Sequence, residues 1–580
     1  MHDKITLLEM KYNHRAPAKF ASTLIIHAVL LTLQALFRAS TMSRLKTSKP
    51  VNKNEDLKVE KDTNLVERTQ RKPLFEYPAL PRWEITSYII GISAILTYGW
   101  YRIYTDGHKR NWYFMYKREV NHTFLGKTFK DETNYEWLLW QPYAWNFLPF
   151  FIGHSLIFNL GDIFLGPSRK HLWEILTFTY SVCSILYVLG PKVVLLNICH
   201  GLLIFMSAKA GRNIWAPWIL GMSCLWFCLH NKQLFPDLVR CFGCSMFLAY
   251  GSLSYIGYSL EYLKGRHRAQ DNTTLKQLWR MFYKNYYMPY MCSLIVLTPD
   301  FEHQLETRHQ RSRDWKGSIF FALRILFWFA VMDTGLHLFY HEAMLADSQL
   351  LRHLPLDTLA ALGYAAGQSF HLKYTIIFGF PAVFARFDNM QPNGQPICTT
   401  RVALYSKVWR YFDRGLYNFF KEYIFLPICR PSFSLWRKIL GVAVSYSFVL
   451  IWHGVTHAYL VWIAVNVIEL FIENAGRALY AVPAVRRWRE EVISDRNFRR
   501  LLGWLLIFPF ATALYSNFYF LAGSKAGTVF VERILYGETF TFQTPSLLLY
   551  VTGYLYNQTC MESDRHFKER PRIDGVKKTQ

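Results

Sequence analysis

Charged residues are scarce in this sequence: they make up 18% of its 580 residues, whereas hydrophobic residues make up 52% and aromatic residues 17%. Soluble domains usually contain about 25% charged residues. Internal repeats are also absent, and no polar stretch between the apolar segments is longer than a loop. These absences argue against a soluble protein and indicate a chain that lies largely in a membrane.

Disulfide frameworks and metal-binding motifs are lacking as well. The 10 cysteines are scattered, and several fall inside apolar segments, where a small buried hydrophobe is their ordinary role. Cys241 and Cys244 form one C-x-x-C pair without a second pair or nearby histidines at metal spacing. His453 and His457 have zinc-ligand spacing, but the glutamate of an H-E-x-x-H motif is missing. We therefore predict neither a disulfide framework nor a metal site.

Apolar segments near the membrane-spanning length of about 17–25 residues recur along the chain. They predict an all-α polytopic membrane protein with about 10–12 transmembrane helices plus re-entrant or interfacial helices. The predicted spans are 86–104, 142–164, 172–189, 191–208, 214–230, 240–262, 279–298, 318–340, 355–384, 438–470 (two passes), 499–521 and 544–557.

The net charge of +25 would suggest a nucleic-acid partner in a soluble protein. Here the Lys and Arg residues concentrate in loops between the apolar segments, at 264–268, 308–316 and 486–500. Such loops are typical of the cytosolic side of membrane proteins. We predict no nucleic-acid partner.

The chain divides into an N-terminal extension (1–79), a membrane domain (80–557) and a polar C-terminal tail (558–580). The extension has a polar part without periodicity, 43–72, which is predicted to be disordered. Its apolar part, 22–37, is compatible with a signal peptide, an extra span or an early start codon.

Lys577 and Lys578 stand four and three places from the end of the sequence. This arrangement resembles the di-lysine retrieval signal of endoplasmic reticulum membrane proteins, which requires a cytosolic tail. It supports a location in the endoplasmic reticulum.

A histidine interrupts one of the most apolar segments. His453 lies within 438–467, and ionisable residues inside a bilayer are candidates for function because they are costly to bury. The spacing of Tyr446, His453, Thr456 and His457 places them on one helical face, which predicts a polar stripe facing a cavity. A neutral histidine bonded to a neighbouring helix is the structural alternative.

Residues 408–420 predict an amphipathic helix that is too short and too charged to span a membrane. Asp413 lies on its polar face, where it either pairs with Arg410 or Arg414 or takes part in chemistry. The apolar stripe comprises Trp409, Phe412, Leu416, Phe419 and Tyr423, and the polar face comprises Arg410, Asp413, Arg414, Tyr417 and Lys421.

Three further charged residues interrupt apolar segments: Arg324, Asp333 and Lys373. Arg324 and Asp333 are too far apart in sequence to face each other on one helix. We predict that these residues form structural pairs with partners on other helices.

The order Trp409-Arg410-Tyr411-Phe412-Asp413, followed by His453 in Trp-His-Gly, resembles the membrane-bound O-acyltransferase superfamily and, within it, the hedgehog acyltransferase family. The resemblance extends from about residue 80 to about residue 555. Further matching positions include 80–84, 130–133, Glu136-Trp137, 259–261, Lys373-Tyr374, Glu473-Asn474 and Ser516-Asn517. The chain departs from the family at Ser293-Leu294-Ile295, where the vertebrate members carry Asn-Gly-Pro.

The resemblance implies a helical fold around a central polar tunnel and an acyltransferase of the endoplasmic reticulum or Golgi membrane. Its acyl donor would be palmitoyl-CoA. Its acceptor would be the N-terminal cysteine of a secreted, Hedgehog-like signalling protein. The enzyme itself would contact membrane lipid. An α-ammonium must lose a proton before it attacks a thioester, which is the work of a general base.

The resemblance also implies roles for individual residues. His453 would be the base, and Asp413 would orient it, position the amine or relay a proton. Trp409 and Asn517 would bind substrate as hydrogen-bond donors. Cys398 would be a haem ligand, with the alternative of an ordinary cysteine in a polar loop.

Two alternatives to this function remain open. One is an acyltransferase of the same fold that acts on a lipid or on a serine of another protein. The other is a non-catalytic paralogue, scaffold or transporter that regulates hedgehog processing.

Overall fold

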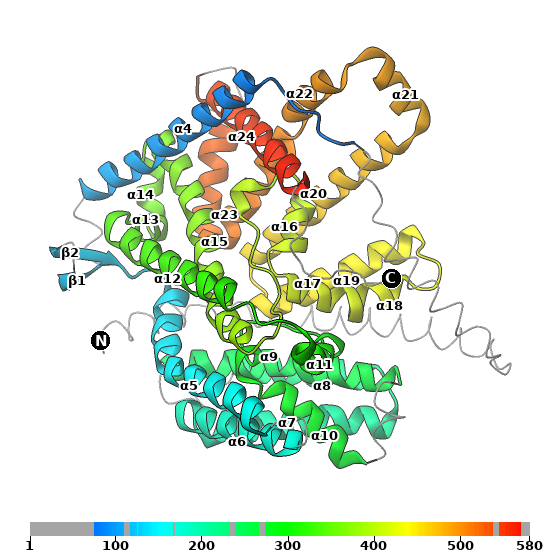
Figure 1. Ribbon diagram of the computed structural model, residues 1–580. Coiled ribbons are helices and arrows are strands. Elements are labelled where there is room, and N and C mark those ends of the chain that lie inside the picture. The colour runs from blue at the N-terminus through cyan, green and yellow to red at the C-terminus, as the bar shows by residue number, and fades with distance from the viewer. Residues whose placement is uncertain are drawn as a thin grey trace.

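The computed structural model describes residues 75–109, 117–123, 126–165, 169–230, 238–265, 273–537 and 544–569 (Figure 1). The predictions for most of the N-terminal extension and for the di-lysine pair lie outside the described residues.

Helices and one two-stranded antiparallel sheet make up the described chain (Figure 1). The first half contains α4 (Arg82–His108), β1 (Lys117–Thr123), β2 (Gly126–Asp131), α5 (Tyr135–Leu165), α6 (Lys170–Leu189), α7 (Pro191–Gly211), α8 (Trp215–His230), α9 (Leu238–Leu263), α10 (Thr274–Asn285), η4 (Met288–Tyr290), α11 (Thr298–Thr307) and η5 (Arg308–Gln310). The second half contains α12 (Trp315–Leu338), α13 (His341–Ala346), α14 (Ser348–His353), α15 (Leu356–Phe387), η6 (Thr399–Arg401), α16 (Tyr405–Tyr411), α17 (Arg414–Phe420), η7 (Lys421–Phe425), α18 (Leu426–Cys429), α19 (Leu435–His453), α20 (His457–Ala481), α21 (Pro483–Val492), α22 (Asp495–Leu505), α23 (Ile507–Phe530), η8 (Val531–Gly537) and α24 (Thr544–Glu569).

By length and composition, 7 helical segments of the described chain can cross a membrane: α5, α6, α7, α12, α19, α20 and the run Asp495–Ile534. The helices α4, α9, α15 and α24 occupy other predicted spans and are also long. The prediction of an all-α polytopic membrane protein is confirmed.

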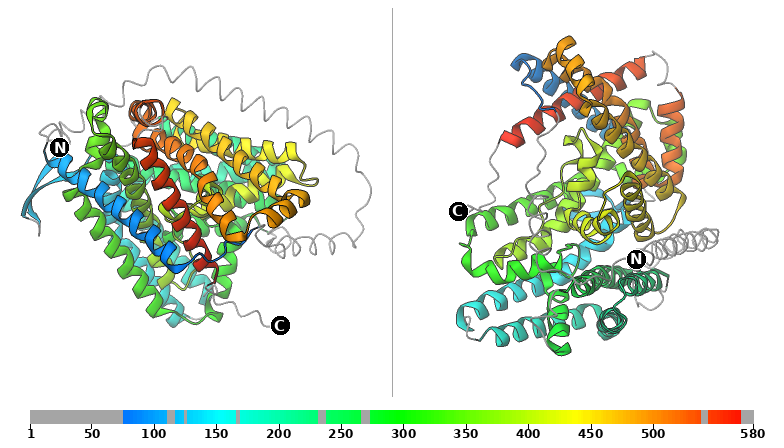
Figure 2. Two further views of the ribbon diagram at one scale, coloured as in Figure 1. Left: turned by 90° about the horizontal axis from the view of Figure 1, so that it is seen from above. Right: turned by 90° about the vertical axis from the view of Figure 1, so that its right-hand side faces the viewer.

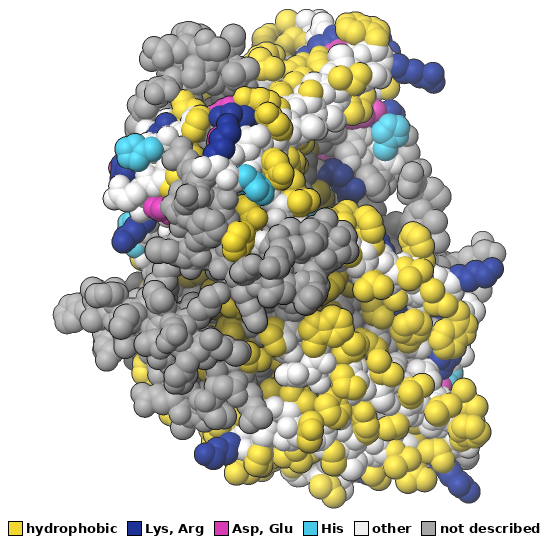
Figure 3. Space-filling model, turned by 90° about the vertical axis from the view of Figure 1, so that its left-hand side faces the viewer, with side chains coloured by type: hydrophobic (Ala, Val, Ile, Leu, Met, Phe, Trp, Pro, Cys, Tyr) yellow, Lys and Arg dark blue, Asp and Glu magenta, His cyan; other side chains and the backbone are white. Residues whose placement is uncertain are grey.

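Large apolar side chains cover much of the surface. Figure 3 shows one face on which hydrophobic side chains spread widely while Lys and Arg lie mainly at its margins. Phe164, Tyr187, Phe320 and Trp436 are among the most exposed. In water such a surface would promote association, whereas in a bilayer it contacts lipid chains.

The predicted span at 279–298 is wrong. Helix α10 ends at Asn285, and the chain continues through η4 and a loop to α11. The side chains from Tyr286 to Val296 are nearly all buried inside the protein. This segment is apolar because it belongs to the protein core, and a hydropathy pattern does not separate core from lipid.

The helices form two groups that are joined by a middle level (Figures 1 and 2). Helices α5 to α10 form one group, and α4, α15 and α22 to α24 lie in the other. Helices α16 to α19 lie between them. Phe419 of α17 and Tyr423 of η7 share a core cluster with Tyr255 and Tyr258 of α9, so the middle level packs directly against the first group.

Helix α22 connects the two ends of the described chain. Arg499, which is fully buried, pairs with Glu562 of α24 at 2.8 Å and donates to the carbonyl oxygen of Pro78 at 2.7 Å. Its neighbour Arg500 pairs with Glu84 of α4 at 2.6 Å. Helix α24 therefore continues past the predicted span that ended at 557, because its polar residues find partners inside the protein.

Candidate active site

Helix α19 ends at His453. Gly454 has a φ of 84°, a left-handed conformation that only glycine adopts without strain, and its N–H bonds to the carbonyl oxygen of Ile451. Thr456 then caps α20 by accepting a hydrogen bond from the N–H of Tyr459. The prediction of two passes here is confirmed, but the continuous polar stripe is wrong because its members lie on two helices.

Aromatic rings surround the His453 imidazole. The ring centroids of Tyr459, Trp462 and Phe520 lie 5.5, 5.7 and 5.3 Å from the imidazole centroid. These rings come from α20 and α23, the helices that pack against the end of α19. They leave His453 with few polar neighbours and hold its ring in place.

Asp413 stands between α16 and α17, so the predicted continuous helix at 408–420 is wrong. Its carboxylate accepts a hydrogen bond from the N–H of Leu416 at 2.9 Å and caps the first turn of α17. Aspartate is a favoured N-cap residue, and this local bond competes with helix continuation. Burial raises the pKa of Asp413 to about 6, although the backbone N–H groups of Leu416 and Gly415 act in the opposite direction.

Ion pairs of Asp413 with the adjacent arginines are absent among the described residues. The Arg410 guanidinium lies over the rings of Tyr411 and Tyr417, and that of Arg414 lies over Tyr411 at 5.3 Å. The alternative of a local ion pair is therefore not found, and no Lys, Arg or His of the described ranges forms an ion pair with Asp413.

The segment that departs from the family pattern packs against α17 beside Asp413. The side chain of Asn393 donates to the carbonyl oxygen of Ile295 at 2.7 Å. A Cβ atom on Gly415 would lie 2.4 Å from the same oxygen. Ser293 has a φ of 65°, so this loop turns through a left-handed residue that is not glycine.

Glu136 of α5 approaches the same region from the other side. Its carboxylate accepts hydrogen bonds from Lys373 at 2.6 Å and from the Tyr374 hydroxyl at 2.8 Å. It also interacts electrostatically with His453 and with Tyr250 of α9. The prediction that Lys373 forms a structural pair is confirmed.

Tyr250 also interacts electrostatically with Asp413. Glu136, Tyr250, Asp413 and His453 lie deep inside the protein, yet each keeps part of its surface accessible. These electrostatic interactions link the four residues, which we call the central polar cluster. Glu136 and Tyr250 were not among the predicted site residues, and the only signal for Glu136 was its place in a matching motif.

A hydrogen bond between Asp413 and His453 is absent among the described residues, although both belong to the central polar cluster. Asp413 does not orient the imidazole directly in this structure. The charged group that interacts electrostatically with His453 is the carboxylate of Glu136.

The two predicted substrate-binding residues lie on α16 and on α23, the helix that also contributes Phe520 to the surroundings of His453. The Trp409 indole donates to Asn466 Oδ1 at 3.1 Å, and its ring packs against Tyr446 and Trp462. Asn517 accepts a hydrogen bond from the Tyr405 hydroxyl at 3.5 Å. The Trp409 donor is therefore occupied by protein, whereas Asn517 uses only its oxygen in this bond.

Cys398 precedes η6, is half-buried and forms no disulfide. Tyr556, which interacts electrostatically with it, donates to the carbonyl oxygens of Thr399 and Val402. Groups of three or more His, Cys, Asp or Glu side chains that could hold a metal ion are not found in the described ranges. A single accessible thiol does fit the donor chemistry of one axial haem ligand.

The remaining predicted pairs gave a mixed outcome. Asp333 of α12 forms an ion pair with Lys130 of β2, as predicted for a partner on another element. Arg324 is exposed on α12 and forms no ion pair with any described residue. The prediction holds for Asp333 and fails for Arg324.

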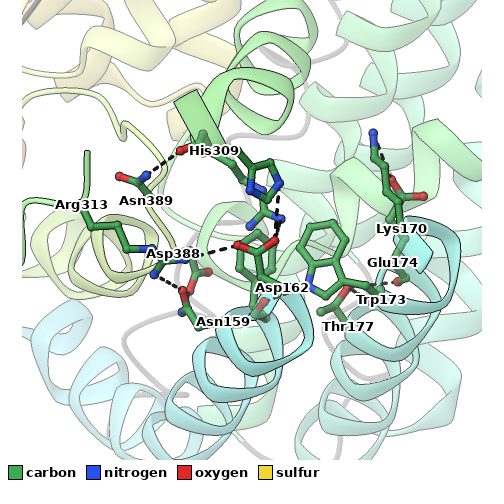
Figure 4. A network of polar contacts seen from close by, with 12 residues as sticks. Asn159, Asp162, Lys170, Trp173, Glu174, Thr177, His309, Arg313, Asp388 and Asn389 are labelled. Atoms are coloured by element: carbon green, nitrogen blue, oxygen red, sulfur yellow. Dashed lines mark hydrogen bonds and ion pairs between the residues drawn. The ribbon is translucent and has the colours of Figure 1, made fainter. Parts of the chain in front are cut away.

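A second polar network lies at the far ends of α5 and α15 (Figure 4). Asp162 pairs with Arg308 at 2.6 Å and with Arg313 at 3.4 Å. Asp388 accepts hydrogen bonds from Tyr287 at 2.8 Å and from Asn159 at 3.1 Å. Both carboxylates are held by several partners, which is typical of a network that fixes helix ends, whereas Nε and Nη1 of Arg308 have no hydrogen-bond partner in the described chain.

Comparison with known proteins matches residues 220–516 to the model of the membrane-bound O-acyltransferase family. The chain is 26% identical over 504 residues, 82% of its length and 97% of the relative, to the mouse protein named protein-cysteine N-palmitoyltransferase HHAT. It is 28% identical over 283 residues, 48% of its length and 55% of the relative, to protein-cysteine N-palmitoyltransferase Rasp of Drosophila melanogaster. A mouse HHAT-like protein is 23% identical over 414 residues, 68% of this chain and 78% of that relative.

Proposed function

Because this chain belongs to the membrane-bound O-acyltransferase family, we propose that it transfers a palmitoyl group from palmitoyl-CoA to the N-terminal cysteine of a secreted, Hedgehog-like protein. The chain is a multi-pass membrane acyltransferase, and the acyl chain and the acceptor are the proposed part. The names of the relatives HHAT and Rasp, both protein-cysteine N-palmitoyltransferase, support palmitoyl as the acyl group and cysteine as the acceptor residue.

The observation that carries the proposal is the position of His453 beside Glu136 in the central polar cluster. Its imidazole has an acidic neighbour, Glu136, and otherwise aromatic surroundings. A base in such a place can remove a proton from the substrate ammonium, because the neighbouring carboxylate stabilises the imidazolium that forms. The amine then attacks the thioester carbonyl, and the sulfur of CoA leaves.

The oxyanion that forms in this attack needs a hydrogen-bond donor. The amide group of Asn517 is the candidate, since only its oxygen is engaged, by Tyr405. Trp409 supports the site by holding Asn466 and by packing against Trp462. Removal of one such donor usually lowers kcat by about 10²–10³-fold.

Palmitoyl-CoA is cytosolic and a secreted acceptor is luminal, so the proposal requires a cavity that both can reach across the bilayer. This requirement suits a protein of the endoplasmic reticulum or Golgi membrane. Burial of a sixteen-carbon chain among apolar helices is favourable by about 0.8 kcal/mol per methylene.

Purified protein, labelled palmitoyl-CoA and peptides that begin with Cys, Ser or acetylated Cys test the proposal. We expect label on the free Cys peptide alone. His453→Ala should lower transfer by about 10²–10⁴-fold. His457→Ala is the matched control, because this histidine is exposed at the start of α20 and should leave transfer unchanged.

A different acceptor is the second candidate, and the Ser293-Leu294-Ile295 loop is the reason to test it. This loop touches α17 through Ile295, next to Asp413, so its shape can alter which acceptor fits. Labelling of the Ser peptide in place of the Cys peptide would favour this candidate. Labelling of neither peptide would favour a non-catalytic protein.

We also propose haem as a separate structural ligand at Cys398, since acyl transfer involves no electron transfer. Bound haem would give the purified protein a strong visible absorbance band. Cys398→Ala should remove the band and leave transfer largely intact.

A further inference from the structure

A polar stripe runs along the buried face of α20, away from His453. It consists of Trp462, Asn466, Glu469 and Glu473, whose spacings of four, three and four place them on one helix face. The stripe extends about 16 Å, at 1.5 Å per residue. Trp462 touches His453 at its near end, and Glu473 meets the exposed Arg477 at its far end.

Two buried polar atoms near this stripe have no hydrogen-bond partner in the described chain: the hydroxyl of Tyr446 and Oε2 of Glu469. Both residues are less than one-tenth exposed. Unsatisfied polar atoms at such depth are costly, so each calls for a partner such as a bound water, a ligand or a transferred proton.

Glu469 is the ionisable member of this set. It is 1% exposed, and its other oxygen accepts a hydrogen bond from the Thr512 hydroxyl at 2.6 Å. No Lys, Arg or His forms an ion pair with it among the described residues. An intramembrane carboxyl group without a counter-ion is typical of proton relays.

The titratable groups that face Glu469 come from three helices. They are Tyr405 of α16, Tyr446 of α19 and Glu473 of α20 itself, while α23 contributes the Thr512 hydroxyl. The Tyr405 hydroxyl also faces Trp462 and Asn517. Tyr405 therefore links Trp462 and Asn517 to Glu469.

The proposed reaction releases a proton, which must leave the site at His453. A substrate ammonium carries three protons on nitrogen and the product amide keeps one, so two protons are lost. The departing CoA sulfur takes one of them to become a thiol. One proton per turnover is left over, and His453 must be free of it before the next cycle.

We propose that Glu469 accepts this surplus proton and passes it toward Glu473 and Arg477. Helix α20 then carries a proton exit path from the site at His453. The inference rests on the proposed function, because only an ammonium acceptor generates the surplus proton. At the far end, Glu473 accepts hydrogen bonds from Ser406 and pairs with Arg477, which is half exposed. The proton reaches solvent there.

The test measures kcat and KM of full-length wild type and Glu469→Gln with palmitoyl-CoA and a Cys peptide between about pH 6 and about pH 9. We expect kcat of the variant to be at least about tenfold lower at low pH, with KM unchanged. Above the amine pKa of about 8, where the peptide arrives without the extra proton, the two rates should converge. Glu469→Asp, which keeps a carboxyl group, should recover part of the loss.

A second peptide isolates proton release from structure. An aminooxy group in place of the terminal amine is neutral at neutral pH, so its acylation leaves no surplus proton. Glu469→Gln should acylate this peptide at the wild-type rate. In wild type alone, the solvent deuterium isotope effect should be larger for the amine than for the aminooxy peptide, a comparison that needs no variant.

An equal loss at every pH and with both peptides would show a structural role and overturn the relay. An unchanged kcat would overturn it too. Glu532→Gln, which alters an exposed ion pair with Arg352, is the matched control and should match wild type throughout. Wild type that fails to label the Cys peptide would overturn the proposed function and the relay together, whereas labelling with identical pH profiles would overturn the relay alone.

Discussion

The carboxylate of Glu136 interacts electrostatically with the imidazole of His453, although more than three hundred residues separate them in the sequence. Lys373 and Tyr374 hold that carboxylate in place. The charge beside the proposed base therefore comes from α5 and is fixed by α15, and it does not come from Asp413.

Replacement of Glu136 should separate stability from catalysis. Glu136→Gln leaves the buried Lys373 ammonium without its partner, which should cost about 3–5 kcal/mol of stability. The double variant Glu136→Gln with Lys373→Gln removes both charges and should recover most of that stability. Transfer should stay low in both variants, as measured by peptide acylation beside thermal unfolding. Full activity in the double variant would contradict a role for the Glu136 charge.

Asp413 combines a helix cap with a charge, and two substitutions distinguish these roles. Asp413→Asn keeps an acceptor for the Leu416 N–H, whereas Asp413→Ala loses it and about 1 kcal/mol of stability. Both variants should lower transfer strongly, because both remove the charge. Unfolding temperature measures the loss of the cap, and acylation rate measures the loss of the charge. Normal transfer by the Asn variant would show that Asp413 serves only as a helix cap.

Stability should depend on pH through Asp388, which lies directly after α15. Burial raises its pKa to about 7, against hydrogen bonds from Ser155 and Tyr287. A raised carboxyl pKa means that the folded state binds the proton more tightly, so stability falls as pH rises from about 4 to about 7. Asp388→Asn should flatten this part of the profile of unfolding temperature against pH. An unaltered slope in the variant would assign the pH dependence to other groups.

Gly415 is needed for the close approach of Ile295. A Cβ atom there would lie 2.4 Å from a backbone oxygen, so Gly415→Ala must displace the loop or α17. We expect a loss of about 1–3 kcal/mol and reduced transfer, since Asp413 moves with the helix. Gly476→Ala in α20 meets nothing within 4 Å and serves as the control, with unchanged or slightly higher stability.

Hydropathy was sufficient for the membrane class and for the separation of α19 from α20. It failed at 279–298, since buried core and lipid-facing helices are equally apolar. It predicted two passes at 438–470 without locating the break after His453, and it missed the break at Asp413, because these breaks depend on a glycine with positive φ and on a side-chain cap. A cap or a glycine of this kind ends a helix without changing the spacing of the apolar residues in the sequence.

The site was predictable in part for a similar reason. His453 and Asp413 stand out because each interrupts a pattern on its own segment. Glu136 and Tyr250 become neighbours of these residues only through the packing of α5 and α9 against the middle level. Partners of this kind have no signature in one sequence, because distance along the chain carries no information about them.

The bonds of α22 set an order for biogenesis. The segment just before α4 and the start of α4 are synthesised long before their partners Arg499 and Arg500, and Glu562 is synthesised later still. Domains generally fold from the N-terminus during synthesis. Here the start of α4 gains these contacts only after α22 and α24 have been made, so a chain truncated before α24 would leave the buried Arg499 without its ion-pair partner.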